Sequence, residues 1–200
     1  MDIYTDYANW KFENFDFINN LVKNKSKSIS RISSVIAVVD YLYEKYVENK
    51  KLTEDEEIFF STGFDYIYDQ FYLLKTLFEL KFNNSFKEME KYSKTINLLL
   101  YINEFQSEAL EYENIDITPL DDLEDKVNKC LDKKENVPDE YFQILNEVNE
   151  SIFEKNNIEV HTMDQIFYEI AIEYGIYKEN DYDLYNEILN RQIEKTRKAE

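Results

Sequence analysis

Glycine and proline are almost absent from this chain, with two of each in 200 residues. Tight hairpin turns and phosphate-cradling loops need glycine, because it adopts positive φ readily and lets the backbone approach a ligand closely. The chain has almost no supply of residues for those turns. This scarcity favours helices joined by polar connections, and it argues against hairpin-rich β folds and Rossmann-type nucleotide sites.

Apolar residues recur at intervals of three and four along most of the chain, which is the spacing of one helix face. This spacing predicts seven or eight helices, at about residues 3–24, 32–49, 53–82, 85–113, 118–133, 139–152, 162–175 and 183–198. We expect an all-α, antiparallel multi-helix bundle. Its two long central helices would be those at 53–82 and 85–113.

Local signals mark several helix ends. The capping-box spacing, Ser or Thr followed three residues later by Glu or Gln, satisfies two free amides of a first turn. It occurs at Thr53/Glu56, Ser85/Glu88 and Thr162/Gln165. Thr118 precedes Pro119, as an N-cap precedes a proline at the first helical position. Gly175 is placed to end the helix that follows Thr162.

Charge and predicted helix length both change at residues 114–118, a short connection. One interpretation divides the chain there, into an N-terminal helical bundle at 1–117 that contains the two long helices and a C-terminal helical subdomain at 118–200. The other interpretation is a single continuous domain. No fixed-period repeat and no Pro/Ser-rich linker decides between them.

The single cysteine, Cys130, excludes an intramolecular disulfide and is compatible with a reducing compartment. Charged residues interrupt the N-terminus, and no apolar run approaches the roughly 20 residues that cross a bilayer. We therefore expect a cytoplasmic protein without a membrane partner.

Acidic residues are concentrated in the middle of the chain. Residues 101–150 hold fifteen Asp and Glu against four Lys, a formal charge of −11 out of −19 for the whole chain. No Lys or Arg lies between Lys94 and Lys126, where nine carboxylates occur: Glu104, Glu108, Glu111, Glu113, Asp116, Asp121, Asp122, Glu124 and Asp125. We call these nine residues the acidic block. A localised anionic surface favours a cationic partner, because opposite potentials steer encounter.

The helical expectation divides the acidic block into two rows. Glu104, Glu108 and Glu111 share one helix face, with about 5–6 Å between neighbours. Duplex DNA carries a phosphate about every 3.4 Å along each strand, so one row alone is too sparse to resemble it. The carboxylates at 121–125 would supply a second row if their helix folds back. The competing interpretation is that both rows are ordinary solvated helix faces.

Catalytic and metal-binding patterns are weak. Di-iron bundles need two Glu-x-x-His motifs, and this chain has one histidine, His161. Glu79-Leu80-Lys81 matches a Glu-x-Lys nuclease element but lies in a predicted helix, without an Asp carried on a preceding strand. Cys130 and His161 lack the neighbours that would activate a nucleophile or a base. We predict no enzyme activity, no cofactor, no metal site and no direct nucleic-acid contact.

We expect instead an acidic binder that inhibits a basic nucleic-acid-binding protein, such as a nuclease effector, by occupying its groove. Small acidic proteins of phages and mobile elements that inhibit CRISPR effectors or restriction enzymes are similar in size, charge and lack of catalytic motifs. Two alternatives stay open. One is an immunity protein for a toxin nuclease, and the other is a structural or scaffolding module that forms homo-oligomers.

Overall fold

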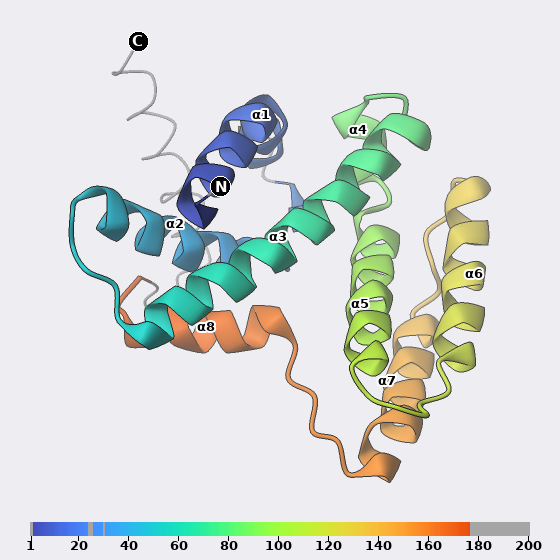
Figure 1. The fold of residues 1–200 in the computed structure, drawn as a ribbon. Helices are drawn as coiled ribbons and strands as arrows, with labels where there is room; N and C mark the ends of the chain where they lie inside the picture. The colour runs from blue at the N-terminus through green and yellow to red at the C-terminus, as the bar shows by residue number, and fades with distance from the viewer. Residues whose placement is uncertain (1, 24–25, 30, 177–200) are drawn as a thin grey trace. The chain divides into compact units, whose positions relative to one another are not determined.

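The computed structural model describes residues 2–23, 26–29 and 31–176. These residues form eight α-helices and two 3₁₀ helices, with no β-strand (Figure 1). The α-helices are α1 (Ile3–Lys23), α2 (Ser33–Val47), α3 (Glu54–Leu80), α4 (Phe86–Glu90), α5 (Ser93–Leu110), α6 (Thr118–Asp132), α7 (Glu140–Ile152) and α8 (Met163–Glu173). The 3₁₀ helices are η1 (Lys27–Ile29) and η2 (Glu154–Asn156). The all-α prediction is confirmed, and the helix predicted at 183–198 lies outside the described residues.

The second of the two long helices that we expected, at 85–113, is interrupted. α4 ends at Glu90, whereas α5 runs from Ser93 to Leu110. At the interruption, the Lys91 carbonyl accepts a hydrogen bond of 2.9 Å from the side chain of Asn136, which is far away in the sequence. The spacing of apolar residues depends only on neighbours in the sequence. It therefore continues across the break and does not indicate this long-range contact.

Asparagine takes the conformational role that glycine has in most proteins. Five asparagines at helix ends and connections have φ between 49° and 67°: Asn49, Asn83, Asn84, Asn114 and Asn157. Asparagine tolerates this left-handed region better than other residues that carry a Cβ, because its short side chain can hydrogen-bond locally. The chain therefore makes its turns with almost no glycine.

The chain divides into two compact units. The split unit contains the chain up to Tyr72 and from Met163 onward, and the middle unit contains Leu73–Thr162. The boundary between them falls inside α3. It differs from the division at 117/118 that the sequence suggested, because residues 111–117 connect α5 to α6, and these two helices pack together within the middle unit.

An aromatic cluster forms the core of the split unit. Tyr7 and Trp10 of α1 pack against three rings of α3, those of Phe60, Phe64 and Phe71, with ring centroids 5.2–5.8 Å apart and edge-to-face geometry. Edge-to-face pairs contribute about 0.5–1.5 kcal/mol each beyond the burial of their area. This cluster fixes α1 on the first part of α3.

A buried carboxylate lies beside this cluster. Asp40 of α2 is 1% exposed, and it accepts hydrogen bonds from the Tyr7 hydroxyl and from Lys11 Nζ, the latter at 2.7 Å. Burial, followed by the charge of Asp40, raises the pKa of the Tyr7 hydroxyl well above its ordinary value, so Tyr7 stays a hydrogen-bond donor. The charge of Asp40 is thus compensated inside the split unit.

A second buried carboxylate, Glu56, joins α2 to the start of α3. Lys45 Nζ donates to both of its oxygens, at 2.6 and 2.7 Å, and the Thr53 amide donates at 2.9 Å. The Glu56 amide donates in turn to Thr53 Oγ1, so the predicted capping box is confirmed. Burial acts to raise the pKa of Glu56, but these hydrogen bonds outweigh it and lower the pKa.

Gly63 allows α2 and α8 to approach α3 closely. A Cβ built at this position would lie 2.6 Å from the Val39 side chain and 2.8 Å from the ring of Phe167. Both distances are far below ordinary van der Waals contact, so any larger residue must push α2 or α8 away from α3. In the sequence alone, Gly63 is a position of low helix propensity within an otherwise helical pattern.

The other helix-end predictions have mixed outcomes. The Glu88 amide donates to Ser85 Oγ, as predicted, and α8 ends just before Gly175, which has φ +67°. Thr118 is the first residue of α6 rather than its N-cap, which is Ile117, and the Thr118 amide donates to Asp116 Oδ1 at 3.0 Å. The third capping box is wrong, since the buried Thr162 hydroxyl makes no hydrogen bond with any described residue.

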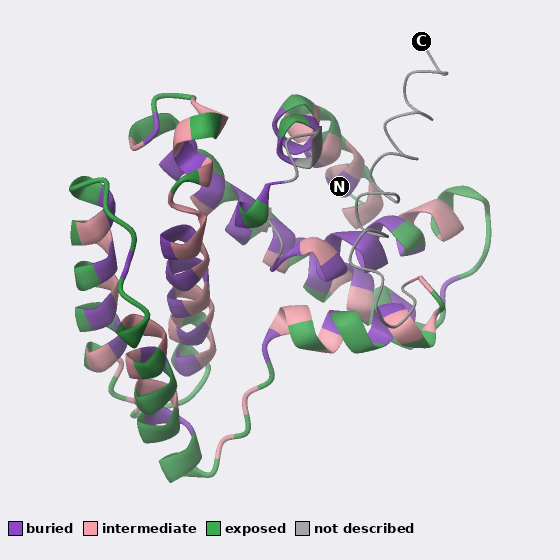
Figure 2. Cartoon of the chain, turned by 180° about the vertical axis from the view of Figure 1, so that it is seen from behind, coloured by how far each residue is buried: buried purple, intermediate pink, exposed green. Residues whose placement is uncertain are grey.

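In the middle unit, α5, α6 and α7 pack against one another around an aliphatic core. Buried residues run along almost all of α5 and along one side of α6, whereas α7 is largely exposed (Figure 2). The hydroxyl of the fully buried Thr95 accepts the Val137 amide at 2.9 Å, which ties the connection between α6 and α7 to α5. This three-helix packing places the acidic block.

Candidate partner-binding surface

The acidic block lies where α5 ends and α6 begins. Glu104 and Glu108 belong to the last turns of α5, and Glu111, Glu113 and Asp116 follow it in the connection. Asp121, Asp122, Glu124 and Asp125 belong to the first half of α6. Six of the nine side chains are exposed, and Glu104, Glu108 and Glu124 are half-buried. The acidic block therefore surrounds one end of a helix pair.

Gln106 connects the two helices at this end. Its Nε2 donates to Asp121 Oδ1 at 2.8 Å and to Glu124 Oε2 at 2.9 Å. An amide that donates to two carboxylates holds like charges close together without neutralising them. Nothing in the spacing of Gln106 singled it out in the sequence, so this residue was missed.

The two predicted rows do not form adjoining rows on one face. Gln106 faces α6, and it lies two positions from both Glu104 and Glu108 in the sequence. Residues two apart in a helix point to nearly opposite sides. Glu104 and Glu108 therefore lie on the side of α5 away from Asp121 and Glu124, and the acidic block wraps around the helix end.

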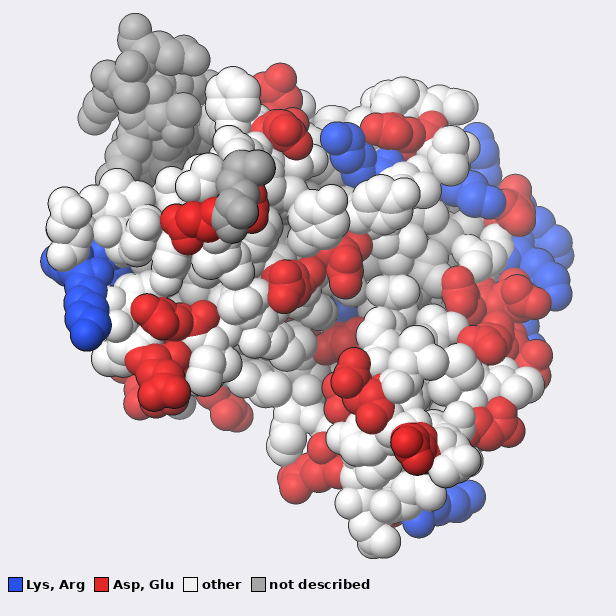
Figure 3. All heavy atoms as spheres, in the orientation of Figure 1, with Lys and Arg blue, Asp and Glu red and all other residues white. Residues whose placement is uncertain are grey.

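The charge of the acidic block from Glu108 to Asp125 is not balanced by cations among the described residues. Among the described residues, no Lys or Arg forms an ion pair with any of the eight carboxylates from Glu108 to Asp125. The lysines of α6 gather toward its other end, at positions 126, 129 and 133, and Figure 3 shows Lys side chains grouped near that end, with carboxylates below them. Within the part of the chain that the structure describes, the carboxylates from Glu108 to Asp125 are thus a group of uncompensated negative charges.

Helix dipoles separate the carboxylates into two groups. A helix N-terminus carries partial positive charge, so Asp121 in the first turn of α6 stabilises that helix. The C-terminus of α5 carries partial negative charge, so Glu108 and Glu111 oppose its dipole. Helix stability accounts for the acidic start of α6 and gives no reason for the acidic end of α5.

Two members of the block also have local roles. The Tyr112 hydroxyl donates to Glu108 Oε1 at 3.3 Å, and desolvation together with the charge of Glu108 raises the Tyr112 pKa. Asp116 accepts hydrogen bonds from Thr118, which lower the pKa of Asp116 and keep it ionised. Tyr112 is 39% exposed, so an aromatic ring with a polar tip lies among the carboxylates, a combination that suits protein interfaces.

The other candidate residues lie apart from one another. Cys130 is half-buried on α6, and the exposed His161 lies 3.1 Å from Glu159 Oε1. Lys81 forms an ion pair with Asp132 of α6. No group of three or more His, Cys, Asp or Glu within the described residues is arranged to hold a metal ion. None of the helices described is both long and apolar enough to cross a membrane.

Comparisons with known proteins found no relative of this chain. No protein-family model matches the chain, and no curated protein and no solved structure matches it.

Proposed function

We propose that this chain is a non-enzymatic protein that binds and inhibits a basic nucleic-acid-binding protein, such as a nuclease effector. The acidic block occupies the surface on which the partner binds nucleic acid. Binding is competitive, because the block and the nucleic acid cannot both lie on that surface. Small acidic inhibitors of CRISPR effectors and of restriction enzymes are similar to this chain in size, charge and lack of catalytic motifs.

The uncompensated charge from Glu108 to Asp125 supports this proposal most strongly. Exposed carboxylates without cation partners retain their attraction for an external positive surface, which steers encounter and sets orientation. The carboxylates at the end of α5 add to this argument, because they oppose the helix dipole and so reduce the stability of the helix. Residues that reduce stability without an internal benefit are typical of functional surfaces.

The arrangement also changes the proposed mode of contact. Two adjoining rows of carboxylates would resemble the two strands of a duplex. Carboxylates that surround a helix end form a compact acidic surface instead. A compact acidic surface would contact a concave basic surface of the partner at one position rather than along a long groove. The proposed contact therefore centres on Glu108, Glu111 and Glu113, with the acidic start of α6 beside them.

The test is affinity capture with charge-reversed variants. The parent chain, immobilised and exposed to host lysate at low salt, should retain proteins that bind nucleic acid, and added duplex DNA should displace them. Replacing Glu108, Glu111 and Glu113 together by Lys should abolish capture. Glu104 is left unchanged in this variant, because one of its carboxylate oxygens is buried.

A matched control reverses three exposed carboxylates of the split unit, Asp65, Glu169 and Glu173, and should capture the same proteins as the parent chain. Equal loss of capture in both variants, or capture that duplex DNA does not compete with, contradicts the proposal. Self-association without any basic partner would favour the scaffolding alternative. A captured toxin nuclease would favour the immunity-protein alternative.

A further inference from the structure

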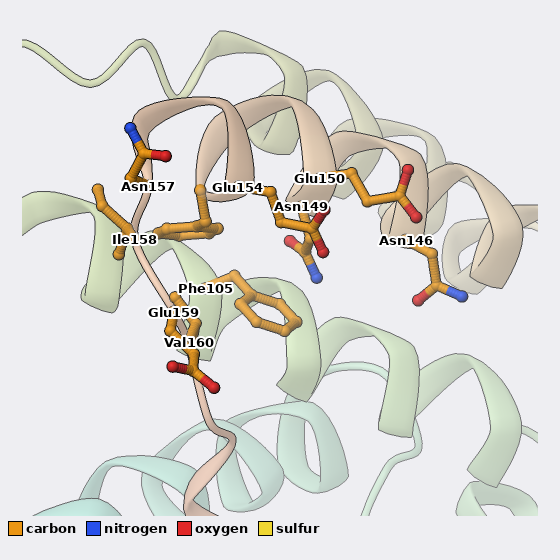
Figure 4. A pocket seen from close by; sticks show the side chains of 10 residues that line it. Phe105, Asn146, Asn149, Glu150, Glu154, Asn157, Ile158, Glu159 and Val160 are labelled. Carbon is orange, nitrogen blue, oxygen red and sulfur yellow. The ribbon is translucent and has the colours of Figure 1, made fainter.

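A pocket of about 580 Å³ opens in the middle unit, on the side where α5 meets α7 and the segment that follows α7. Figure 4 shows Phe105 of α5 on one side, side chains of α7 above it, and Glu159 and Val160 of the following segment facing Phe105. The residues that line the pocket are Phe105, Asn146, Asn149, Glu150, Phe153, Glu154, Asn157, Ile158, Glu159 and Val160. The volume lies in the range of pockets that hold small ligands or single side chains.

The pocket has an aromatic base. The rings of Phe105 and Phe153 lie with centroids 6.0 Å apart and planes 44° apart, and both residues are buried. A buried ring that borders a pocket offers an apolar face to a ligand. Such a face also attracts a cation that lies over it, because the ring carries negative charge above its plane.

The polar side chains of the pocket are either negatively charged or neutral: three carboxylates, and three amides that can both donate and accept hydrogen bonds. Glu150, Glu154 and Glu159 contribute three carboxylates, and none of the described Lys and Arg residues lines the pocket. His161 Nε2 lies 3.1 Å from Glu159 Oε1 at the outer edge. The composition therefore selects against anions and favours a cation.

One acceptor in the pocket wall has no donor. Asn149 Oδ1 is buried and makes no hydrogen bond with any described residue. A buried acceptor without a donor costs about 1–3 kcal/mol, and the terminal torsion of an asparagine amide turns easily. If the amide turns so that this oxygen faces the pocket, a ligand that brings several N–H groups can satisfy it as well as the carboxylates.

We propose that this pocket binds a guanidinium group carried on an alkyl chain, as in arginine. The planar guanidinium has five N–H donors and stacks on aromatic faces, whereas an ammonium group is a compact and more strongly hydrated charge. The base of Phe105 and Phe153 takes the stacked group, and the carboxylates with Asn149 take its donors. The group comes either from an arginine of the basic partner, which rests on the proposed function, or from a free guanidinium compound.

The first experiment titrates the full chain with N-acetyl-L-arginine methylamide and follows amide resonances by NMR. Saturable shifts should centre on the residues of the pocket. The citrulline analogue, which has the same shape without the charge, should bind about tenfold more weakly, as expected when hydrogen bonds to a charged group are lost. The corresponding lysine compound should also bind more weakly than the arginine compound.

Variants assign the effect to the pocket. Glu150→Gln with Glu159→Gln should weaken binding of the arginine compound about tenfold or more. Glu140→Gln with Glu147→Gln removes two exposed carboxylates at the start and middle of α7 that do not line the pocket, and should leave binding unchanged. Shifts that do not saturate, equal binding of the citrulline compound, or equal loss in both double variants overturns the proposal.

The partner-capture assay then distinguishes the two sources of the guanidinium group. If the group belongs to the partner, Glu150→Gln with Glu159→Gln weakens capture by the acidic chain as well as binding of the small compound. If it is a free compound, the same variant loses the small compound and captures the partner normally. Failure of the arginine compound to bind refutes the pocket proposal alone, whereas failure of capture by the parent chain refutes the proposed function alone.

Discussion

The two units of this protein use charge in opposite ways. The split unit buries charged groups and pairs each inside the fold: Asp40 with Lys11, Glu56 with Lys45, and Arg31 with Asp164 at 3.7 Å. Among the described residues, no fully buried side chain of the middle unit is charged, and most of its carboxylates lie on the surface. Charged side chains therefore stabilise the split unit through ion pairs, whereas in the middle unit they give the surface a negative electrostatic potential.

This difference shows why net charge alone is a poor guide to a functional surface. A buried ion pair produces little electrostatic field outside the protein, because its two charges compensate each other within a few ångströms. An exposed carboxylate without a cation keeps its field, which reaches about 8 Å into a solution of physiological ionic strength. The carboxylates from Glu108 to Asp125 matter because they are clustered, mostly exposed and, among the described residues, not paired with a cation. The following changes test that contrast.

The largest effect is expected for a buried pair. Lys11→Met should lower the free energy of unfolding by about 3 kcal/mol, because Asp40 is left buried without its cation. The matched change Lys94→Met breaks the pair with Asp139, whose side chain is 92% exposed, and should cost less than about 1 kcal/mol. Urea denaturation measures both. Equal costs would mean that the two units do not differ in how they use charge.

A smaller loss is expected at Gly63. Gly63→Ala gains helix propensity but forces a methyl group against Val39 and Phe167, so the net cost should be about 1–2 kcal/mol. Val39→Ala removes the contacting methyl groups. The double variant should therefore be more stable than the sum of the two single changes predicts. Strict additivity in thermal unfolding would show that Val39 does not limit the approach of α2 to α3.

Acid should weaken the split unit through Glu56. Since its folded pKa is lowered, the stability that Glu56 contributes is complete above its ordinary pKa of 4.5 and is lost as the pH falls through the folded pKa. Glu56→Gln should flatten this part of the acid unfolding curve. Glu57→Gln, an exposed residue of the same turn, should leave the curve as it is in the parent chain. Identical curves for the parent chain and Glu56→Gln would contradict the assignment.

The smallest effects should have opposite signs at the two ends of the acidic block. Glu111→Gln removes a charge that opposes the α5 dipole and should raise the free energy of unfolding by about 0.5 kcal/mol at low ionic strength. Asp121→Asn removes a charge that favours the α6 dipole and should lower it by a similar amount. Thermal unfolding of both variants in dilute buffer measures the pair. If both variants changed the free energy of unfolding in the same direction, the argument that the carboxylates at the end of α5 reduce stability would fail.

The helices could be predicted from sequence because their signals are local. Thr53 with Glu56 marks the start of α3, and asparagines replace the missing glycines at its end, as Asn83 and Asn84 do with positive φ. The break before Ser93 could not be predicted, because it depends on Asn136 from another part of the chain. The tight packing at Gly63 depends in the same way on α2 and α8.

The sequence indicates which residues make up the acidic block, but it does not indicate how these residues are arranged in space. The run of carboxylates is a property of the sequence, and its placement at one helix end follows from the α5 and α6 bounds. The separation of Glu104 and Glu108 from Asp121 depends on which side of α5 meets α6, and Gln106 reveals this only in the folded chain. The pocket beside Phe105 brings together residues from α5 and from beyond α7, so periodicity gave no sign of it.

The most direct test of the central claim is the salt dependence of affinity between this chain and its captured partner. The dissociation constant, measured from about 50 to about 500 mM salt, should rise steeply, because screening shortens the reach of the acidic block. The variant with Lys at positions 108, 111 and 113 should lose both the affinity and the salt dependence. An affinity that is equal across this range, or equal in the parent chain and the variant, would contradict the claim that the acidic block binds the partner.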